Sequence, residues 1–398
     1  MSASGGRWPQ RRLLALDWLV LESGRERFVE RLFAGLCARL LEDGLPIARS
    51  TLHVRTLHPQ FFGARLLWRP GMEEAEITFL DHDAITDRRF LDSPVRALYE
   101  GAEAIHQRLD LPTAAPREYP VYAELRAEGM TDYVAMPMTF TDGTRHACTW
   151  ATTRPGGFRA ADLAALGELL PALAMATEIR LSRRIACNLL DAYVGRHAGA
   201  RILAGEIRRG SGATVRAAIW QCDLRDFTTI VERLARDEVI ACLNAFFDAV
   251  GAPVEARGGE ILKFIGDGML AIFPLEEEAA CHRALRAAAE ARRGLRGLDT
   301  ERRWSPGPLR FALALHVGDV MYGNIGTSSR LDFTVIGPAV NVAARLQQLA
   351  KDLDRDVLIS GAFAAMCACD APLLEPLGRF PLRGVPEPVE VFALAHGS

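Results

Sequence analysis

Several features that would place this chain in a special class are missing from its 398 residues. The eight cysteines include no CxxC pair, and the one close pair, Cys367 and Cys369, has no histidine partner, which argues against a disulfide scaffold or a zinc site. No apolar run approaches the ~20 residues that cross a bilayer. No long apolar segment with a cleavage site follows the basic start at 1–12, so we expect no signal peptide.

Blocks of like charge are also missing, and the net charge is only −3, so the sequence gives no sign of a nucleic-acid surface. Hydrophobic residues make up 49% and charged residues 24%, which is typical of a globular protein. The length suits two domains. We therefore expect a cytoplasmic protein with no membrane span and no nucleic-acid partner.

Lysine is the scarcest of the charged residues. Only two of the 47 basic residues are lysines, Lys263 and Lys351, and the others are arginines. A coding bias toward arginine explains the skew most simply. Because an ammonium is a compact point charge and a guanidinium is a broad planar fork, each retained lysine raises the question of what arginine could not do there.

The first 177 residues alternate helical and strand-like patterns. The sequence predicts helices over 13–41, 95–107 and 160–179, strands over 51–57, 64–68 and 75–80, and a hairpin over 133–152. This mixture predicts one α+β domain.

The segment 178–212 is predicted to connect this domain to a second one. Leu181, Ile185 and Leu189 form an apolar stripe, which leaves two interpretations open: a helix packed on its own domain, or a short parallel coiled coil between two protomers. Glycines between Gly195 and Gly212 are expected to end the helix and form a linker.

A new pattern begins near residue 213 and continues to the end of the chain. The predicted order is a strand at 217–222, a helix at 227–250, a strand–turn–strand at 261–273, a helix at 276–296, a strand at 309–316, a hairpin-like pair at 320–322 and 332–336, a helix opened by Gly337-Pro338, a strand at 357–360, a helix from Gly361 and a strand at 390–394.

Two aspartates follow or join strands in this second region. Asp223 ends an apolar strand, and Asp267 lies in the turn Gly266-Asp267-Gly268. If the hairpin pairs with the first strand, both carboxylates reach one edge of the sheet, and such a pair suits Mg²⁺. Asp-Gly is also a favoured turn dipeptide, which would explain Asp267 by itself.

A second pair lies on one predicted helix face. Asn341 and Arg345 are spaced i and i+4, so they project side by side. Asparagine can hold a sugar oxygen and arginine a phosphate. Taken alone, such a pair is more often a solvated helix face.

Together, these segments resemble the class III nucleotidyl cyclases, the adenylate and guanylate cyclases. The resemblance covers about 215–395 and lies in separated motifs in the same order: 222–228, 258–268, 315–326 and 333–346. It implies a ferredoxin-like catalytic domain over 213–398, joined by the helical connector 178–212 to the first domain.

The resemblance implies a phosphorus–oxygen lyase that converts ATP to 3′,5′-cyclic AMP and pyrophosphate. Asp223, Asp267 and the Leu224 carbonyl would hold two Mg²⁺ or Mn²⁺ ions per site. Asn341 would orient the ribose, and Arg345 would stabilise charge on the α-phosphate. The backbone at a helix N-terminus would cradle the β- and γ-phosphates; its residues are Arg225, Phe227 and Thr228.

Base choice in this family depends on two positions, here Lys263 and Thr334, which match the adenine-reading pattern; guanylate cyclases carry Glu and Cys there. Thr334 also resembles the subgroup that bicarbonate stimulates. The family builds its site between two catalytic domains, which implies a homodimer with two shared sites and an inactive monomer. One protomer would supply the aspartates, and its partner Lys263, Thr334, Asn341 and Arg345.

Two residues depart from the family pattern. Asp226 replaces the usual Gly, and its charge would weaken triphosphate binding, recruit a third cation or simply be solvated. Pro338 replaces an acidic residue or Asn and fits a first helical turn. Arg383 is a weak candidate for the family's C-terminal phosphate-binding residue.

Three other functions are alternatives to an adenylate cyclase. Gly258-Gly259-Glu260 resembles a diguanylate cyclase turn, but Ile261 and Leu262 follow it and the pair Asn341 and Arg345 has no role there, which excludes that family. A guanylate cyclase and a catalytically silent nucleotide-binding regulatory module stay open.

The first domain, 1–177, resembles a GAF sensory domain in its order of elements, in Glu128-Gly129-Met130 and in the Asp142-Gly143 turn. This implies an unknown small ligand or a dimerising role, and regulation of the cyclase through 178–212. His58, ahead of Phe61-Phe62, would be a ligand or haem contact, or a histidine bonded to the backbone.

Overall fold

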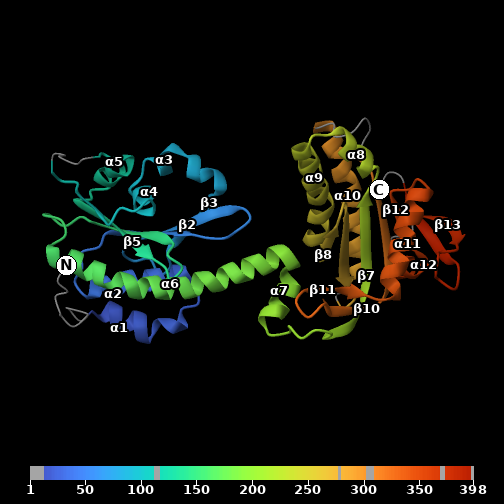
Figure 1. The fold of residues 1–398 in the computed structure, drawn as a ribbon, viewed down its shortest axis with the longest axis horizontal. Coiled ribbons are helices and arrows are strands. Elements are labelled where there is room, and N and C mark those ends of the chain that lie inside the picture. The colour runs from blue at the N-terminus through green and yellow to red at the C-terminus, as the bar shows by residue number, and fades with distance from the viewer. Residues whose placement is uncertain (1–12, 112–116, 277–278, 302–308, 368–372, 396–398) are drawn as a thin grey trace. The chain divides into compact units, whose positions relative to one another are not determined.

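The computed structural model describes residues 13–111, 117–276, 279–301, 309–367 and 373–395. The chain divides into two compact units, residues 1–189 and 190–398 (Figure 1). The division falls inside the predicted connector. Both units combine helices with one mainly antiparallel sheet, so the α+β class is as predicted.

The N-terminal unit is a six-stranded antiparallel sheet in the order β3-β2-β1-β6-β5-β4, with helices on both faces. Its elements are α1 Leu14–Leu21, α2 Val29–Glu42, β1 Arg49–Arg55, β2 Phe61–Trp68, β3 Glu76–Asp81, α3 Arg88–Leu91, α4 Pro94–Tyr99, β4 Ile105–Arg108, α5 Pro120–Ala127, β5 Asp132–Thr139, β6 Arg145–Thr152 and α6 Ala160–Val194, with 3₁₀ turns at Ser23–Arg25 and His82–Thr86. α1, α2 and α6 enclose the larger apolar core, and α3, α4 and α5 lie over the opposite face (Figure 1).

Two helix predictions for this unit were wrong in part. The helix expected over 13–41 is broken into α1 and α2 by the 3₁₀ turn Ser23–Arg25. The helix expected over 95–107 ends at Tyr99, because Gly101 adopts a φ of +123°, and the chain from Ile105 pairs with β5 instead. The predicted hairpin over 133–152 is confirmed as β5 and β6.

α6 is one continuous helix over the predicted helix 160–179 and its predicted continuation into the connector. Leu181 and Ile185 pack on the N-terminal core, as the first interpretation of their stripe predicted. α6 and α9 (Arg236–Ala256) are long and apolar enough to cross a membrane by length and composition, a test that core helices also pass. Both contribute buried residues to apolar cores, and the absence of a membrane span stays a prediction.

The glycine-rich stretch after α6 is not a plain linker, which corrects the sequence prediction. Gly195, at a φ of +86°, ends α6, but α7 (Arg196–Leu203) follows at once. Gly199 lies within α7, where a Cβ would come within 3.1 Å of the Leu190 side chain. The glycine therefore allows close packing there rather than ending the helix.

The C-terminal unit is an eight-stranded sheet in the order β13-β14-β12-β10-β7-β9-β8, with β11 paired to β10. Its further elements are β7 Gly212–Leu224, α8 Phe227–Arg233, α9, β8 Glu260–Ile265, β9 Gly268–Pro274, α10 Ala280–Glu301, β10 Phe311–Gly326, β11 Leu331–Ile336, α11 Pro338–Asp352, β12 Val357–Ser360, α12 Gly361–Ala364, β13 Leu374–Phe380 and β14 Val389–Leu394. α9 and α10 cover one face of the sheet, and α11 packs on the other (Figure 1).

Most of these elements were predicted from the sequence, but where one element continues into the next was not. The helix expected over 227–250 is interrupted between Arg233 and Arg236, and the strands expected at 309–316 and 320–322 are one strand, β10. β13 was not predicted. The strand–turn–strand over 261–273 and the Pro338 helix start are confirmed.

Candidate active site

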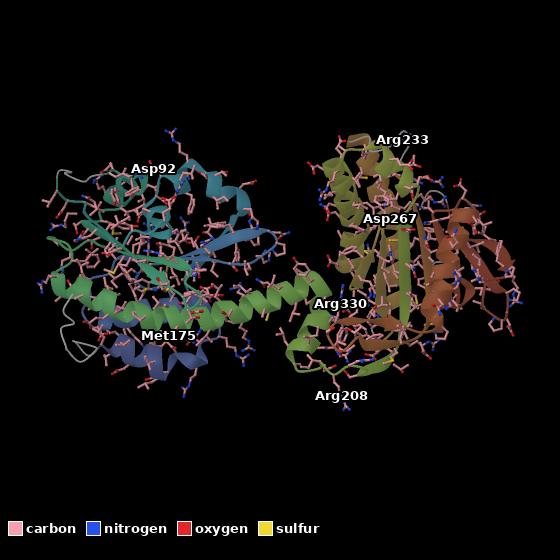
Figure 2. All side chains as sticks on the ribbon, in the orientation of Figure 1. Asp92, Met175, Arg208, Arg233, Asp267 and Arg330 are labelled. Carbon is pink, nitrogen blue, oxygen red and sulfur yellow. The ribbon has the colours of Figure 1, made fainter. Side chains whose placement is uncertain are left out.

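The strand pairing brings Asp223 and Asp267 together at one end of the neighbouring strands β7 and β9. Asp223 of β7 lies opposite Gly268 of β9, and the backbone NH of Leu224 donates to the Asp267 carbonyl at 3.1 Å. Gly268 is required for this approach, because a Cβ there would lie 2.8 Å from the Cys222 carbonyl oxygen. Asp267 is marked within the C-terminal unit in Figure 2.

The Asp223 carboxylate changes the pKa of Asp267, and one lysine ammonium binds to Asp223. Partial burial and then the neighbouring Asp223 carboxylate raise the pKa of Asp267 to about 6. Lys351, in the last turn of α11, donates to Asp223 Oδ2, and its charge draws the pKa of Asp267 the other way. Lys351 stood out in the sequence by its rarity alone, and nothing there indicated its partner.

This pair of aspartates is suited to a divalent cation. Carboxylate oxygens are hard ligands, and their mutual repulsion is relieved when a cation binds between them. Among the described residues there is no group of three or more His, Cys, Asp or Glu side chains that could hold a metal. A cation bound here would therefore complete its coordination with backbone carbonyls, water or phosphate, as Mg²⁺ commonly does.

A second polar group forms where β8 contacts β11. Lys263 Nζ donates to Asp332 Oδ2 at 2.6 Å, and Thr334 follows two positions later, on the same face of β11. The Thr334 hydroxyl is buried and has no hydrogen-bond partner among the described residues. A buried hydroxyl without a hydrogen-bond partner is costly, so this position is suited to a hydrogen bond with a ligand. Asp332 was not predicted as a site residue, although its i+2 spacing from Thr334 indicates that the two side chains share one face of a strand.

Asn341 and Arg345 are exposed on α11, while Ala343, Leu346 and Ala350 are buried on its other side. In the part of the chain that the structure describes, neither polar side chain forms a hydrogen bond or ion pair with Asp223 or Asp267. One chain thus brings the two aspartates and Lys351 together at one place. It brings Lys263, Asp332 and Thr334 together at a second place, and Asn341 and Arg345 face solvent.

The predicted phosphate loop is partly committed to other contacts. The Arg225 side chain is only 9% exposed; it donates to the Ala350 and Arg355 carbonyls at 2.7 and 2.6 Å and pairs with Asp354 at 2.8 Å. The backbone NH of Arg225 donates to the Arg310 carbonyl at 2.8 Å, so this NH is also engaged within the chain. Phe227 and Thr228 begin α8, and their predicted role stays a prediction.

Asp226 takes a left-handed backbone conformation with a φ of 57°. This explains why a glycine is common at that position of the family, and Asp is one of the few other residues that tolerate it. Its side chain is exposed to solvent. Arg383 is also exposed, and no described contact ties it to the aspartates.

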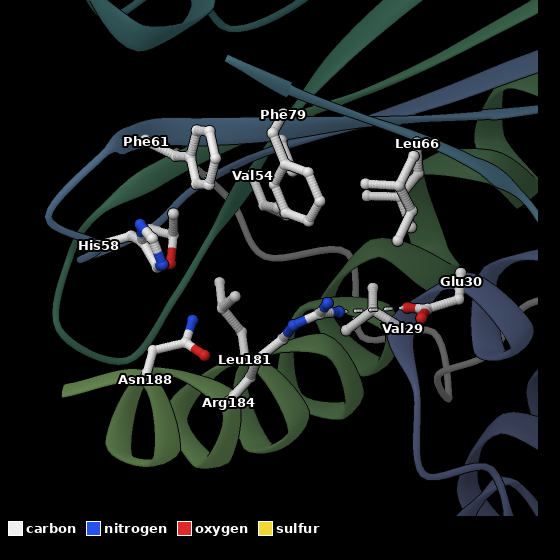
Figure 3. A pocket seen from close by; sticks show the side chains of 13 residues that line it. Val29, Glu30, Val54, His58, Phe61, Leu66, Phe79, Leu181, Arg184 and Asn188 are labelled. Carbon is white, nitrogen blue, oxygen red and sulfur yellow. Dashed lines mark ion pairs between the residues drawn. The ribbon is translucent and has the colours of Figure 1, made fainter. Parts of the chain in front are cut away.

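His58 forms a hydrogen bond with the backbone, which is one of the roles predicted for it. The NH of Gln60 donates to His58 Nδ1 at 3.1 Å, and its ring stacks on Phe61 with centroids 4.8 Å apart. The cavity beside it, shown in Figure 3, holds about 40 Å³, which is room for a water and far too little for haem.

Residues 213–396 match the family model of the adenylate and guanylate cyclase catalytic domain. They form a class III nucleotidyl cyclase catalytic domain. The family predicted from the sequence is therefore confirmed for this region.

Known cyclases are similar to the same region. Adenylate cyclase 1 of Rhizobium meliloti is 34% identical over 173 residues, 43% of this chain and 26% of that protein. The adenylate cyclase of Anabaena cylindrica is 32% identical over 168 residues, 41% of this chain and 33% of that protein. The match thus spans about a quarter to a third of these relatives.

Solved structures with a similar region include the adenylyl cyclase CyaB from P. aeruginosa, at 22% identity and a TM-score of 0.41, covering 47% of this chain and 97% of that one. The guanylyl cyclase Cya2 is 26% identical with a TM-score of 0.40, covering 46% and 93%.

The raised pKa of Asp267 predicts how stability depends on pH without metal. Because folding raises this pKa to about 6, the folded state favours the protonated carboxyl; that stabilisation is complete below about pH 4 and is lost as pH rises through about 6. We expect the unfolding temperature in EDTA to fall between about pH 5 and 7.5, and less steeply in Asp267→Asn. Equal slopes for the two proteins in a thermal melt series would contradict this.

Lys351 should lower the pKa of Asp267. Removing its charge in Lys351→Met should raise that pKa further, because the attraction that opposes Asp223 is lost. The measurement is an NMR titration of the Asp267 carboxyl in EDTA, with Lys351→Arg as the charge-keeping control. A midpoint unmoved in Lys351→Met would refute the assignment.

Proposed function

We propose that this protein is an adenylate cyclase that converts ATP to 3′,5′-cyclic AMP and pyrophosphate. The observation that carries the proposal is the Lys263 ammonium next to the strand that bears the buried, unpartnered Thr334 hydroxyl, within a cyclase domain. Adenine presents an acceptor at N1 and a donor at N6, which complement an ammonium and a hydroxyl oxygen. The two curated relatives named above are adenylate cyclases, which supports the same choice.

Asp223, Asp267 and the Leu224 carbonyl would hold Mg²⁺ or Mn²⁺, two ions per site. Bound there, these ions would neutralise the triphosphate and lower the pKa of the ribose 3′-hydroxyl. Asn341 would fix the ribose so that O3′ is in line with the leaving oxygen, and Arg345 would meet the charge that develops on the α-phosphate. The 3′-hydroxyl loses its proton to water as the O3′–Pα bond forms, the bond from Pα to the bridging oxygen breaks, and pyrophosphate leaves with that oxygen.

The arrangement within one chain favours a homodimer. Asp223 contacts Lys351 of its own α11, whereas Asn341 and Arg345 on the same helix are exposed and have no described contact with the aspartates. A second protomer would bring its Asn341, Arg345, Lys263 and Thr334 to the first protomer's carboxylates, giving two shared sites. We also propose that the N-terminal unit is a GAF-like regulator and that the C-terminal domain is ferredoxin-like; bicarbonate stimulation and a cytoplasmic location stay predictions.

A mixing experiment tests the reaction and the shared site together. Asp223→Ala and Arg345→Ala should each lower cyclic AMP formation by about 10²–10³-fold, because each removes charge stabilisation from the transition state. Co-refolding the two variants in equal amounts should restore about a quarter of wild-type activity, since half of the dimers would be mixed and each would have one intact site.

The outcomes of that experiment separate its two parts. No recovery from a mixture of folded dimers would contradict the shared site. No cyclic AMP from the wild-type protein with ATP and Mg²⁺ or Mn²⁺ would contradict the reaction and favour the silent regulatory module.

The base assignment has its own test. The double variant Lys263→Glu with Thr334→Cys should raise the ratio of kcat/KM for GTP to that for ATP by at least about tenfold, because donor and acceptor are exchanged at both positions. Lys351→Arg, which leaves both base-reading positions intact, serves as the matched control. An unchanged ratio in the double variant would contradict the assignment.

A further inference from the structure

The N-terminal unit contains a cavity that plays no part in the cyclase reaction. It holds about 320 Å³ and lies between the β1–β2–β5–β6 part of the sheet and the helices α3, α4 and α5. That volume suits a small organic molecule.

The floor of this cavity is polar. Arg49, Thr51 and His53 alternate along β1 onto this side, while Leu52 between them lies in the apolar core on the other face. Arg65 of β2 pairs directly opposite His53, so it joins the same floor. A sheet face that is covered by helices yet carries these side chains is shaped for a polar ligand.

Two guanidiniums on this floor lack a full set of partners. The Nε atoms of Arg49 and Arg65 are buried and have no hydrogen-bond partner within the described residues. Arg65 donates from Nη2 to the Thr78 hydroxyl at 3.3 Å, a neutral acceptor. Arg49 Nε lies 3.8 Å from Glu128, and that carboxylate is closer to Arg69, at 3.2 Å.

The neighbouring groups do not supply the missing negative charge. Burial, followed by the charges of Arg65 and Arg49, lowers the pKa of His53 to about 3, so this imidazole is neutral. The Thr51 hydroxyl is bonded to His53 Nε2 at 2.9 Å and to the Thr149 hydroxyl at 2.6 Å. Two adjacent, partly buried guanidiniums whose nearest described carboxylate, Glu128, lies closer to Arg69 are costly, and an anion would relieve that cost.

Aromatic and apolar residues line another part of the cavity. Phe62 of β2 and Phe90 of α3 meet edge to face with centroids 6.0 Å apart, and Val95 and Tyr99 of α4 belong to the same lining. The acidic residues that line the cavity belong to the helical side and are engaged elsewhere or exposed: Asp87 caps α3, Asp92 pairs with Arg117 at 2.7 Å, and Glu124 is exposed.

The smaller cavity on the other side of the sheet differs from this one in how its arginine is paired. There Arg184 faces Glu30 at 3.6 Å, so the one guanidinium among its lining residues has a carboxylate of the protein itself (Figure 3). The Arg49 and Arg65 pair has one such carboxylate, Glu128 at 3.8 Å from Arg49 Nε, and Arg69 shares it at 3.2 Å.

We propose that the larger cavity binds a small organic molecule with an anionic head group, a carboxylate or a phosphate, on an apolar body about the size of one aromatic ring. The head group is bound by Arg49 and Arg65, and the body packs against Phe62, Phe90 and Tyr99. Such binding does not depend on the proposed cyclase activity.

The test uses isothermal titration calorimetry on the full chain with three matched probes: 3-phenylpropionate, phenyl phosphate and the neutral 3-phenylpropanamide. At least one anion should bind with a Kd below about 1 mM, and the amide at least about tenfold more weakly. The stronger of the two anions identifies the head group.

Two variants locate the binding. Arg65→Met should weaken binding of the preferred anion at least about tenfold, whereas Arg31→Met, an exposed arginine on α2, should leave the Kd within about twofold. Without ligand, Arg65→Met should melt no lower than the wild type, because it removes repulsion between two cations. If it fails to fold, Arg49→Met is measured with the same expectation of weakened binding.

Three results would overturn the proposal: neither anion binding at about 5 mM, the amide binding as tightly as the anions, or unchanged affinity in the arginine variants. All are binding readouts, so an inactive cyclase domain would leave the conclusion intact and a failed titration would leave the proposed reaction intact.

Discussion

Two carboxylates held side by side are the constraint on which the catalytic unit depends. β7 and β9 fix Asp223 and Asp267 at one end, and the repulsion between them must be met by a cation. Lys351 meets part of it from α11. Arg225, next to this pair, is bonded to carbonyls at the same end of that helix. The contacts that tie α11 to the aspartate strand therefore also position Asn341 and Arg345.

The parts of this site that depend on local sequence signals could be predicted. Gly266-Asp267-Gly268 is a turn whatever surrounds it, and Gly337-Pro338 starts a helix for local reasons, so both were predictable. The backbone at Arg225 was predicted to contact a phosphate because the acceptor of its NH, the Arg310 carbonyl, lies far along the chain. Gly199 misled for the same reason: its need for a close neighbour, Leu190, shows only in the packed helices. The partners of a residue, rather than its type, were what the sequence lacked.

Asp226 illustrates how a backbone requirement and a charge can be met by one residue. The left-handed turn before α8 disfavours most side chains by about 1 kcal/mol, and aspartate by less, since its short side chain tolerates that conformation. A carboxylate next to the first turn of a helix also interacts favourably with the helix dipole. The substitution of the usual glycine is thus compatible with the fold, and its charge acts on the triphosphate only if the exposed side chain turns toward it.

The arginine bias of this chain makes its buried arginines informative. A coding preference explains arginine on the surface, where any cation is solvated, but a buried guanidinium must be satisfied whatever the codon usage. Arg180 in the N-terminal unit obeys this rule, donating to the Glu26, Ala176 and Ser23 carbonyls. Arg225 does so in the catalytic unit. Arg49 and Arg65, in a cavity large enough for a ligand, depart from that rule, since their Nε atoms are buried without a hydrogen-bond partner among the described residues, and composition supplies no reason for this.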